Sequence, residues 1–151
     1  MPQGITSLRL AATSLLKHLL INICYNIGES DVHIMPESKL RSQSMDFAVQ
    51  IINLVKSLKE KRESIISNQI GRSGTSIGAN IREAQYAHGK ADFIAKLQIA
   101  LKEANETGYW LELLYKTNYI SESDYKTLDS ACTSIRVMLI SSITTAKENT
   151  K

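Results

Sequence analysis

Cysteine and histidine are scarce in this chain, and their spacing excludes several classes of site. There are two cysteines, Cys24 and Cys132, and three histidines, His18, His33 and His88. Neither a Cys-x-x-Cys nor a Glu-x-x-His pair occurs, so we expect no zinc site and no di-iron centre. No disulfide framework is expected either, which favours the reducing cytoplasm as the location. Cys132 lies in an apolar helical pattern and is expected to be a buried, unreactive thiol.

A long uninterrupted apolar run is also missing. The apolar segment Ile5–Ile27 contains Arg9, Lys17 and His18, whereas a membrane-spanning helix needs about 20 residues with few or no charges. We therefore expect no membrane partner. Two interpretations of this segment remain open: an amphipathic extension, or sequence upstream of a true start at Met35. We favour the second, because the helical pattern begins only after that methionine.

Motifs of common enzyme classes are absent as well. The stretch GRSGTSIGAN is neither preceded by an apolar strand nor followed by Gly-Lys-Ser/Thr, as a phosphate-binding loop requires. Ser73 and Ser76 have no histidine or lysine base nearby in the sequence, so neither is expected to be a nucleophile. We expect no catalytic residue, no cofactor and no enzymatic activity.

Positive and negative side chains are nearly balanced in number but unevenly distributed. The chain has 18 basic and 15 acidic residues. Between Lys56 and Lys90 there are seven basic and three acidic residues, whereas between Lys102 and Asp129 there are three basic and six acidic ones. One part of the fold is therefore expected to be positive and another negative. This distribution suits either a polyanionic partner or head-to-tail self-association.

Apolar residues recur three or four positions apart after Ser44, which predicts four amphipathic helices. Residues 1–43 are expected to form an extension and linker, residues 44–147 the helices, and residues 148–151 a tail. Short connections make consecutive helices antiparallel, so the predicted fold is all-α, an antiparallel up-and-down four-helix bundle. The residues expected to face inward are, helix by helix, Ala48, Ile51, Ile52, Val55 and Leu58; Ile66, Ile70, Ser73, Ile77, Ile81 and Ala84; Phe93, Leu97, Ala100, Ala104, Leu111 and Leu114; and Tyr125, Leu128, Cys132, Ile135, Leu139 and Ser142.

Capping residues predict where the helices end. The second helix is expected to end near Gly89, which suits a left-handed cap. The third helix is expected to run from Ala91 to Lys116, with Asn118 as its cap. Ser121–Asp124 approximates a capping box at the start of the fourth helix.

The second helix is unusual in carrying Gly71, Gly74 and Gly78. Each glycine costs roughly 1 kcal/mol relative to alanine inside a helix. A helix that tolerates this cost usually recovers it where another backbone approaches closely. We therefore expect another helix to pass close to Gly74 and Gly78.

The second and third helices carry a recognisable resemblance. The segments QIGRSGTSIGANIREA, KADFIAKLQIALKEANETGYWLELL and NYISESDY resemble the four-helix bundle proteins encoded by intervening sequences in bacterial 23S ribosomal RNA genes. The resemblance covers about Ser44–Lys147 and rests on Gln69, Arg72, Ser73, Ser76, Ile77, Asn80, Ile81, Glu83, Ala84, Phe93, Leu97, Leu101, Gly108 and Leu111. It implies a bundle related to the accessory subunit of diversity-generating retroelements, a ring-like pentamer that associates with nucleic acid and a reverse transcriptase.

A polar seam runs along one flank of the second helix, beside the isoleucine stripe. Its members are Arg62, Gln69, Ser73, Ser76, Asn80 and Glu83. Two interpretations remain open. The seam either fixes the register of the bundle through intramolecular hydrogen bonds, or forms, together with Gly74 and Gly78, an interface with a second copy of the chain.

The opposite flank is basic in the sequence pattern. Its members are Lys61, Arg72, Arg82 and Lys90, with Asn68, Thr75 and Ala79 between them and no acid. This basic flank is either an ordinary solvated face or a stripe that binds phosphates. Because no aromatic residues accompany it, the second interpretation predicts contacts with the backbone and shape of a nucleic acid.

These patterns support two functional hypotheses. The first is a non-enzymatic bundle that self-associates, as a pentamer if the resemblance holds, and binds structured RNA or DNA through the basic flank. The second is a purely structural or protein-adaptor bundle without nucleic-acid binding.

Overall fold

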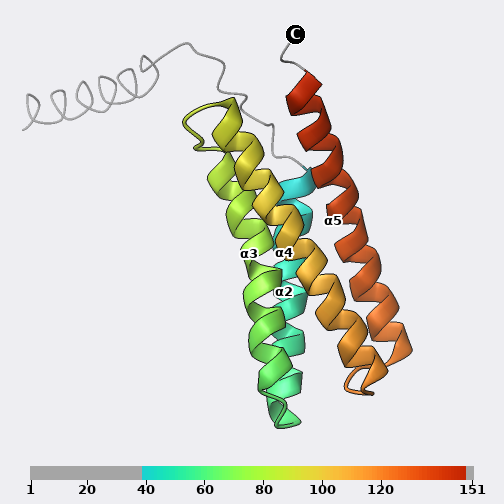
Figure 1. The fold of residues 1–151 in the computed structure, drawn as a ribbon. Helices are drawn as coiled ribbons and strands as arrows, with labels where there is room; N and C mark the ends of the chain where they lie inside the picture. The colour runs from blue at the N-terminus through green and yellow to red at the C-terminus, as the bar shows by residue number, and fades with distance from the viewer. Residues whose placement is uncertain (1–38, 149–151) are drawn as a thin grey trace, which may run out of the picture. The chain divides into compact units, whose positions relative to one another are not determined.

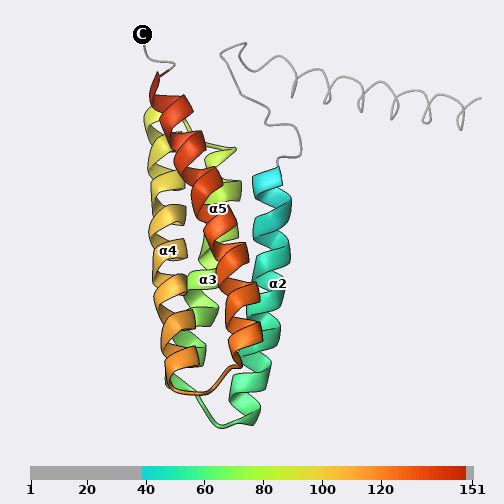
Figure 2. The same cartoon turned by 90° about the vertical axis from the view of Figure 1, so that its right-hand side faces the viewer.

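A computed structural model describes residues 39–148, which form four α-helices joined by short loops. They are α2 (Lys39–Glu60), α3 (Ile65–Ala84), α4 (Lys90–Lys116) and α5 (Glu122–Glu148). Consecutive helices run antiparallel, and α2 packs against both α3 and α5 (Figure 1, Figure 2). The predicted up-and-down four-helix bundle is confirmed, and no strand occurs among the described residues. The expectations for Ile5–Ile27 and Met35 concern residues outside the described range.

The core is an apolar layer to which all four helices contribute. In α3, α4 and α5 the predicted stripes are largely buried, including Ile70, Ile77, Ile81, Leu97, Ala100, Ala104, Leu111, Leu114, Leu128, Cys132, Ile135 and Leu139. Burial of one leucine-sized side chain stabilises the fold by about 1.5–3 kcal/mol. These stripes therefore provide the main force that holds the helices together.

The predicted stripe of α2 is wrong in two positions. Phe47 is 1% exposed and lies in the core, whereas Ile52 is 41% exposed and Ala48 is only partly buried. The helix also begins at Lys39 rather than near Ser44, and Leu40 near its start is buried. A phenyl ring buries more apolar area than a methyl group, so α2 is rotated to place Phe47, not Ala48, inside.

Two helices end in a left-handed residue, Arg62 after α2 and Asn118 after α4, each with a φ of 60°. At the end of α4, the Asn118 N–H donates to the Tyr115 carbonyl at 3.0 Å, and the Tyr119 N–H donates to the Leu114 carbonyl at 2.9 Å. This is a Schellman arrangement, which satisfies carbonyl groups at the end of a helix. The expectation that Asn118 caps this helix is confirmed.

The loop between α3 and α4 differs from the expectation. Helix α3 ends at Ala84 rather than near Gly89, and Gly89 is extended, with φ 169° and ψ 177°, so it is not a left-handed cap. It lies at the start of α4 instead, where its carbonyl accepts a hydrogen bond from the Phe93 N–H at 2.9 Å. The Asp92 carboxylate accepts the His88 N–H at 3.1 Å. This contact at the beginning of α4 helps to hold residues 85–89 in a loop, although helix α3 was expected to continue through them.

The starts of α3 and α5 are both capped by side chains. At α5 one bond of the expected capping box is present, since the Asp124 N–H donates to Ser121 Oγ at 3.1 Å; the Asp124 carboxylate accepts the Ser121 hydroxyl at 2.7 Å rather than the Ser121 N–H. At α3 the Glu63 carboxylate accepts the N–H groups of Ile66 and Ser67 at 2.8 and 2.7 Å. The cap by Glu63 was not predicted, because glutamate is not among the residues preferred at a helix start, and the serine at the N-cap position, Ser64, makes no capping hydrogen bond with its side chain.

Candidate functional site

The glycine-containing side of α3 lies against α2. A β-carbon on Gly74 would lie 2.9 Å from two side-chain carbons of Ile51, closer than normal contact distance, and one on Gly78 would lie 3.5 Å from the backbone oxygen of Ser44. Gly74 is itself buried. The close approach at these two glycines is therefore a contact between two helices of the same chain.

A buried pair of hydroxyl groups joins α3 to α4. Ser73 Oγ and Thr107 Oγ1 are 2.9 Å apart, and Thr107 Oγ1 also lies 2.8 Å from the carbonyl oxygen of Glu103. Both side chains are 0% exposed. Hydrogen bonding matters here because an unpaired hydroxyl group in the core costs about 1–3 kcal/mol. Thr107 was absent from the predicted set, although it falls on the inward stripe of α4 between Ala104 and Leu111.

The other members of the polar seam differ in what they contact. Glu83 accepts a hydrogen bond from Lys96 of α4 at 2.6 Å, and this contact raises the pKa of Lys96 from its ordinary value. The Asn80 amide donates to the Ser76 carbonyl at 2.9 Å, which is a bond within α3. The side chains of Gln69 and Ser76 make no hydrogen bond within residues 39–148.

These contacts support the intramolecular interpretation for part of the polar seam. Ser73 and Glu83 fix the register of α3 against α4, and Arg62 lies in the turn before α3 instead of on the helix. Ser73 is buried inside the chain and so is unavailable to a second copy. For Gln69 and Ser76 the subunit interface stays a prediction.

Arg72, the central residue of the basic flank, is bound by two acids of α4. Its guanidinium donates to the Glu106 carboxylate and lies 3.5 Å from Glu103 Oε2. The hydrogen bond and the charge of Glu106, with that of Glu103, raise the pKa of Arg72 from its ordinary value. Glu103 Oε2 is buried and receives no hydrogen bond within residues 39–148, so the Arg72 charge compensates it. The expectation of a flank without acids is wrong at this position, because the acids come from the next helix.

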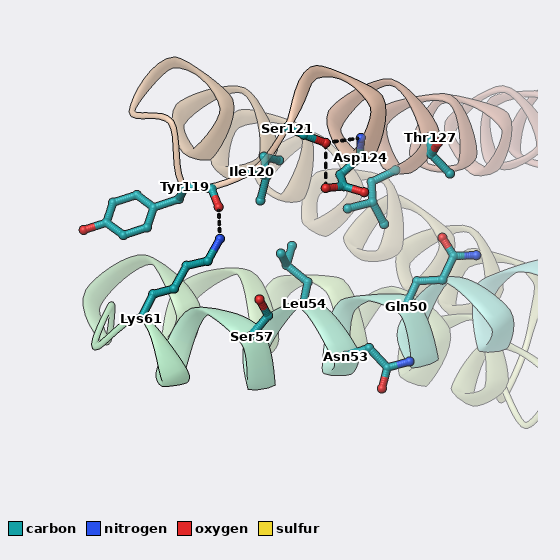
Figure 3. A pocket seen from close by; sticks show the side chains of 11 residues that line it. Gln50, Asn53, Leu54, Ser57, Lys61, Tyr119, Ile120, Ser121, Asp124 and Thr127 are labelled. Atoms are coloured by element: carbon teal, nitrogen blue, oxygen red, sulfur yellow. Dashed lines mark hydrogen bonds between the residues drawn. The ribbon is translucent and has the colours of Figure 1, made fainter.

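The remaining basic residues do not form one stripe with Arg72. Lys61 lies in the turn before α3, and its Nζ donates to the Tyr119 carbonyl of the α4–α5 loop at 2.7 Å (Figure 3). Arg82 is exposed near the end of α3, and Lys90 is the first residue of α4. A helix of this length places its two ends about 30 Å apart. The predicted phosphate-binding stripe is thus divided between the two ends of the bundle.

An apolar row is exposed on the outer surface of α2. Met45, Val49 and Ile52 are 42%, 53% and 41% exposed, respectively. We call these three residues the α2 apolar stripe. Their spacing of four and three residues places them on one side of the helix.

A pocket of about 590 Å³ lies between α2 and α5, beside the α4–α5 loop (Figure 3). Polar side chains of both helices and the apolar side chains of Leu54, Ile120 and Leu128 line it. Lys61 extends across one end of the pocket toward the loop (Figure 3). This pocket was not predicted, because α2 and α5 are the first and last helices within residues 39–148 and their contact cannot be read from neighbouring residues.

The described residues give no sign of metal or thiol chemistry. No group of three or more histidine, cysteine or acidic side chains among them is arranged to hold a metal ion. Cys132 is buried, and its thiol donates to the Ala104 carbonyl at 3.2 Å. Burial raises the pKa of this thiol from 9.0 to about 11, which disfavours the reactive thiolate. None of the helices in residues 39–148 combines the length and apolarity that crossing a bilayer requires.

Comparison with known proteins agrees with this fold. Residues 37–141 match the family model of the 23S rRNA-intervening sequence protein. The chain is also similar to a protein of unknown function from the S23 ribosomal protein family of Bacteroides thetaiotaomicron, known from a crystal structure. The two are 56% identical with a TM-score of 0.68, and the similarity covers 69% of this chain and 97% of the other. No curated protein matches the chain. With a family model that spans α2, α3, α4 and most of α5, the chain belongs to the 23S rRNA-intervening sequence protein family.

Proposed function

We propose that the chain is a non-enzymatic helical bundle that self-associates through the outer face of α2. The observation that carries this proposal is the α2 apolar stripe, Met45, Val49 and Ile52, each more than two-fifths exposed. Contiguous apolar rows on the surface of a folded domain commonly mark contacts with another protein. Burial of one half-exposed side chain of this size in an interface contributes roughly 1 kcal/mol to the free energy of association.

A second copy of the chain is the partner that the charge distribution favours. The segment Lys56–Lys90 has an excess of basic residues and Lys102–Asp129 an excess of acidic ones. Two oppositely charged faces attract each other, so that copies of the chain associate head to tail. Such contacts close into a ring when the rotation between neighbouring copies divides a full turn evenly. A pentamer is the ring implied by the sequence resemblance. Two members of the polar seam on α3, the exposed Gln69 and the partly buried Ser76, are the candidate surface for the other half of this contact.

Native mass spectrometry of the full chain tests self-association directly. We expect a single oligomer at micromolar concentration, of five copies if the resemblance extends to assembly. Val49→Asp should dissociate it, because the new carboxylate would have to be buried without a partner. The matched control is Val137→Asp on α5, since Val137 is 61% exposed and Val49 53%. A monomeric wild-type chain contradicts self-association, and a folded Val49→Asp variant that keeps its mass contradicts the proposed face.

Polyanion binding is a second candidate function, favoured by exposed basic side chains, of which all but Arg82 lie outside the predicted stripe. Lys56, Lys59, Arg62 and Arg82 are exposed and make no ion pair within residues 39–148. Three of them lie together around the turn between α2 and α3. Phosphate contacts of such residues would make binding fall steeply with salt and depend little on sequence.

Electrophoretic titration with two unrelated structured RNAs, each at two salt concentrations, tests this second candidate. Changing Lys59 and Arg62 together to glutamate should weaken binding to both RNAs and leave the oligomeric state unchanged. Absence of binding at low salt would leave the alternative, a structural or adaptor bundle. Unaltered binding by the double variant would reject the turn as the binding surface.

A further inference from the structure

The α2 wall of the pocket between α2 and α5 is a row of polar side chains. Gln50, Asn53, Ser57 and Lys61 recur three or four residues apart and all line the pocket, as residues on one side of a helix do. The side chains of Gln50, Asn53 and Ser57 make no hydrogen bond within residues 39–148. Their hydrogen-bonding groups are therefore available to a bound molecule.

Lys61 makes one end of the pocket positive. It is the one basic residue among those that line the pocket, and its ammonium group has three donors, of which one is used by the Tyr119 carbonyl. The acid in the lining, Asp124, already accepts the Ser121 hydroxyl through Oδ2. It also lies in the first turn of α5, where the helix dipole offsets a negative charge.

The middle of the pocket is apolar. Leu54 of α2 and Ile120 of the α4–α5 loop approach each other between the two walls (Figure 3). Leu128 of α5, 8% exposed, adds to the same surface. The pocket volume lies within the range of about 300–1,000 Å³ that is typical of sites for small organic molecules.

We propose that this pocket binds a small amphipathic organic anion. Lys61 holds the carboxylate or sulfonate of the ligand by a charge-assisted hydrogen bond, and the apolar body of the ligand lies on Leu54 and Ile120. Ser57 supplies a further hydrogen bond along the α2 wall. The site lies within one chain and includes none of the residues of the α2 apolar stripe, so its variants differ from those that test self-association.

The probe for this site is 8-anilinonaphthalene-1-sulfonate, an aromatic sulfonate whose fluorescence rises in apolar surroundings. Titration into the full chain should show one saturable site per chain. Lys61→Met should weaken its affinity roughly tenfold, because the charge-assisted hydrogen bond is lost while the length of the side chain is kept. The matched control is Lys59→Met, because Lys59 is an exposed lysine in the same segment that does not line the pocket. This variant should bind the probe with unchanged affinity.

Competition experiments distinguish the contribution of the ligand's charge from that of its apolar body. Octanoate should displace the probe at concentrations where the uncharged octan-1-ol does not. Thermal melts establish that each variant is folded, and Ile120→Asp, which places a charge in the apolar centre, provides a second variant that should abolish binding. The proposal is overturned if the probe shows no saturable binding, if Lys59→Met and Lys61→Met lose equal affinity, or if octanol competes as well as octanoate.

Discussion

Ile51 of α2 occupies the space in which a side chain of Gly74 on α3 would begin. A β-carbon at Gly74 would lie 2.9 Å from both γ-carbons of Ile51, and Ile51 is fully buried. A branched side chain in the core has no room to move aside. The glycine is therefore required by the distance between the two helices.

Substitution of Gly74 should destabilise the bundle more as the new side chain becomes larger. We expect Gly74→Leu to lower the free energy of unfolding by several kcal/mol or to prevent folding, because overpacking by one or more methylene groups already costs about 1–3 kcal/mol. Gly74→Ala should be destabilising or nearly neutral, since its better helix propensity offsets about 1 kcal/mol of the clash. Gly78→Ala is the control, because a β-carbon there makes an ordinary 3.5 Å contact. Gly78→Ala should raise the free energy of unfolding measured by urea denaturation. A Gly74→Leu variant of unchanged stability would contradict the packing explanation.

The Ser73–Thr107 pair should show energetic coupling. Thr107→Val leaves the buried Ser73 hydroxyl without its partner on α4 and should cost about 1–3 kcal/mol. The double variant Ser73→Ala with Thr107→Val should cost less than the sum of the single variants, because both polar groups are then removed. A double-mutant cycle from urea denaturation measures the difference. Strict additivity would show that the two hydroxyls do not interact in solution.

Arg72 and Arg82 should respond differently to reversal of charge. Arg72→Glu would place a third carboxylate beside Glu103 and Glu106, so its melting temperature should fall. Arg82→Glu should melt like the wild type, because Arg82 has no acidic partner within residues 39–148. Circular dichroism melts at low and high salt measure both variants, and salt should reduce the difference between them by screening. Equal melting temperatures at low salt would contradict the ionic contacts of Arg72.

Stability should fall at alkaline pH through Cys132. Its thiol pKa is raised in the fold from 9.0 to about 11, so the unfolded chain loses this proton first as the pH rises. The resulting contribution is fully present below pH 9 and is lost as the pH approaches 11, with a magnitude on the order of 2 kcal/mol. Other groups titrate in this range, so the measurement is the difference in pH dependence between a Cys24→Ser background and the same chain with Cys132→Ala. Parallel curves would show that Cys132 is not buried in solution.

Local patterns were sufficient to predict the helices and most of their inward faces. Residues such as Leu97, Leu111 and Leu139 are buried where the helical period placed them, because that period depends only on neighbouring residues. Gly74 was also informative on its own, since a glycine inside a helix needs a reason that packing supplies. The spacing did not determine the rotation of α2, where Phe47 took the position expected for Ala48.

Contacts between distant segments could not be predicted in the same way. The acids that bind Arg72 lie 31 and 34 positions further along the chain, and nothing beside Arg72 in the sequence indicates them. The same holds for the bond from Lys61 to Tyr119, 58 residues apart. The prediction of a basic flank was wrong at Arg72 for this reason, because the acids that pair with it belong to the facing helix α4.

The bond between Lys61 and the Tyr119 carbonyl makes the two ends of the bundle unequal. It ties the α2–α3 turn to the α4–α5 loop, and both turns carry a left-handed residue at the same end of the molecule (Figure 1, Figure 2). The opposite end has a single connection between α3 and α4, together with the first turn of α2 and the last turn of α5. Amide protons near Leu58 and Leu114 should therefore exchange with deuterated solvent more slowly than those near Leu40 and Ile143. We therefore expect local opening of the bundle to begin at the end that lacks this tie.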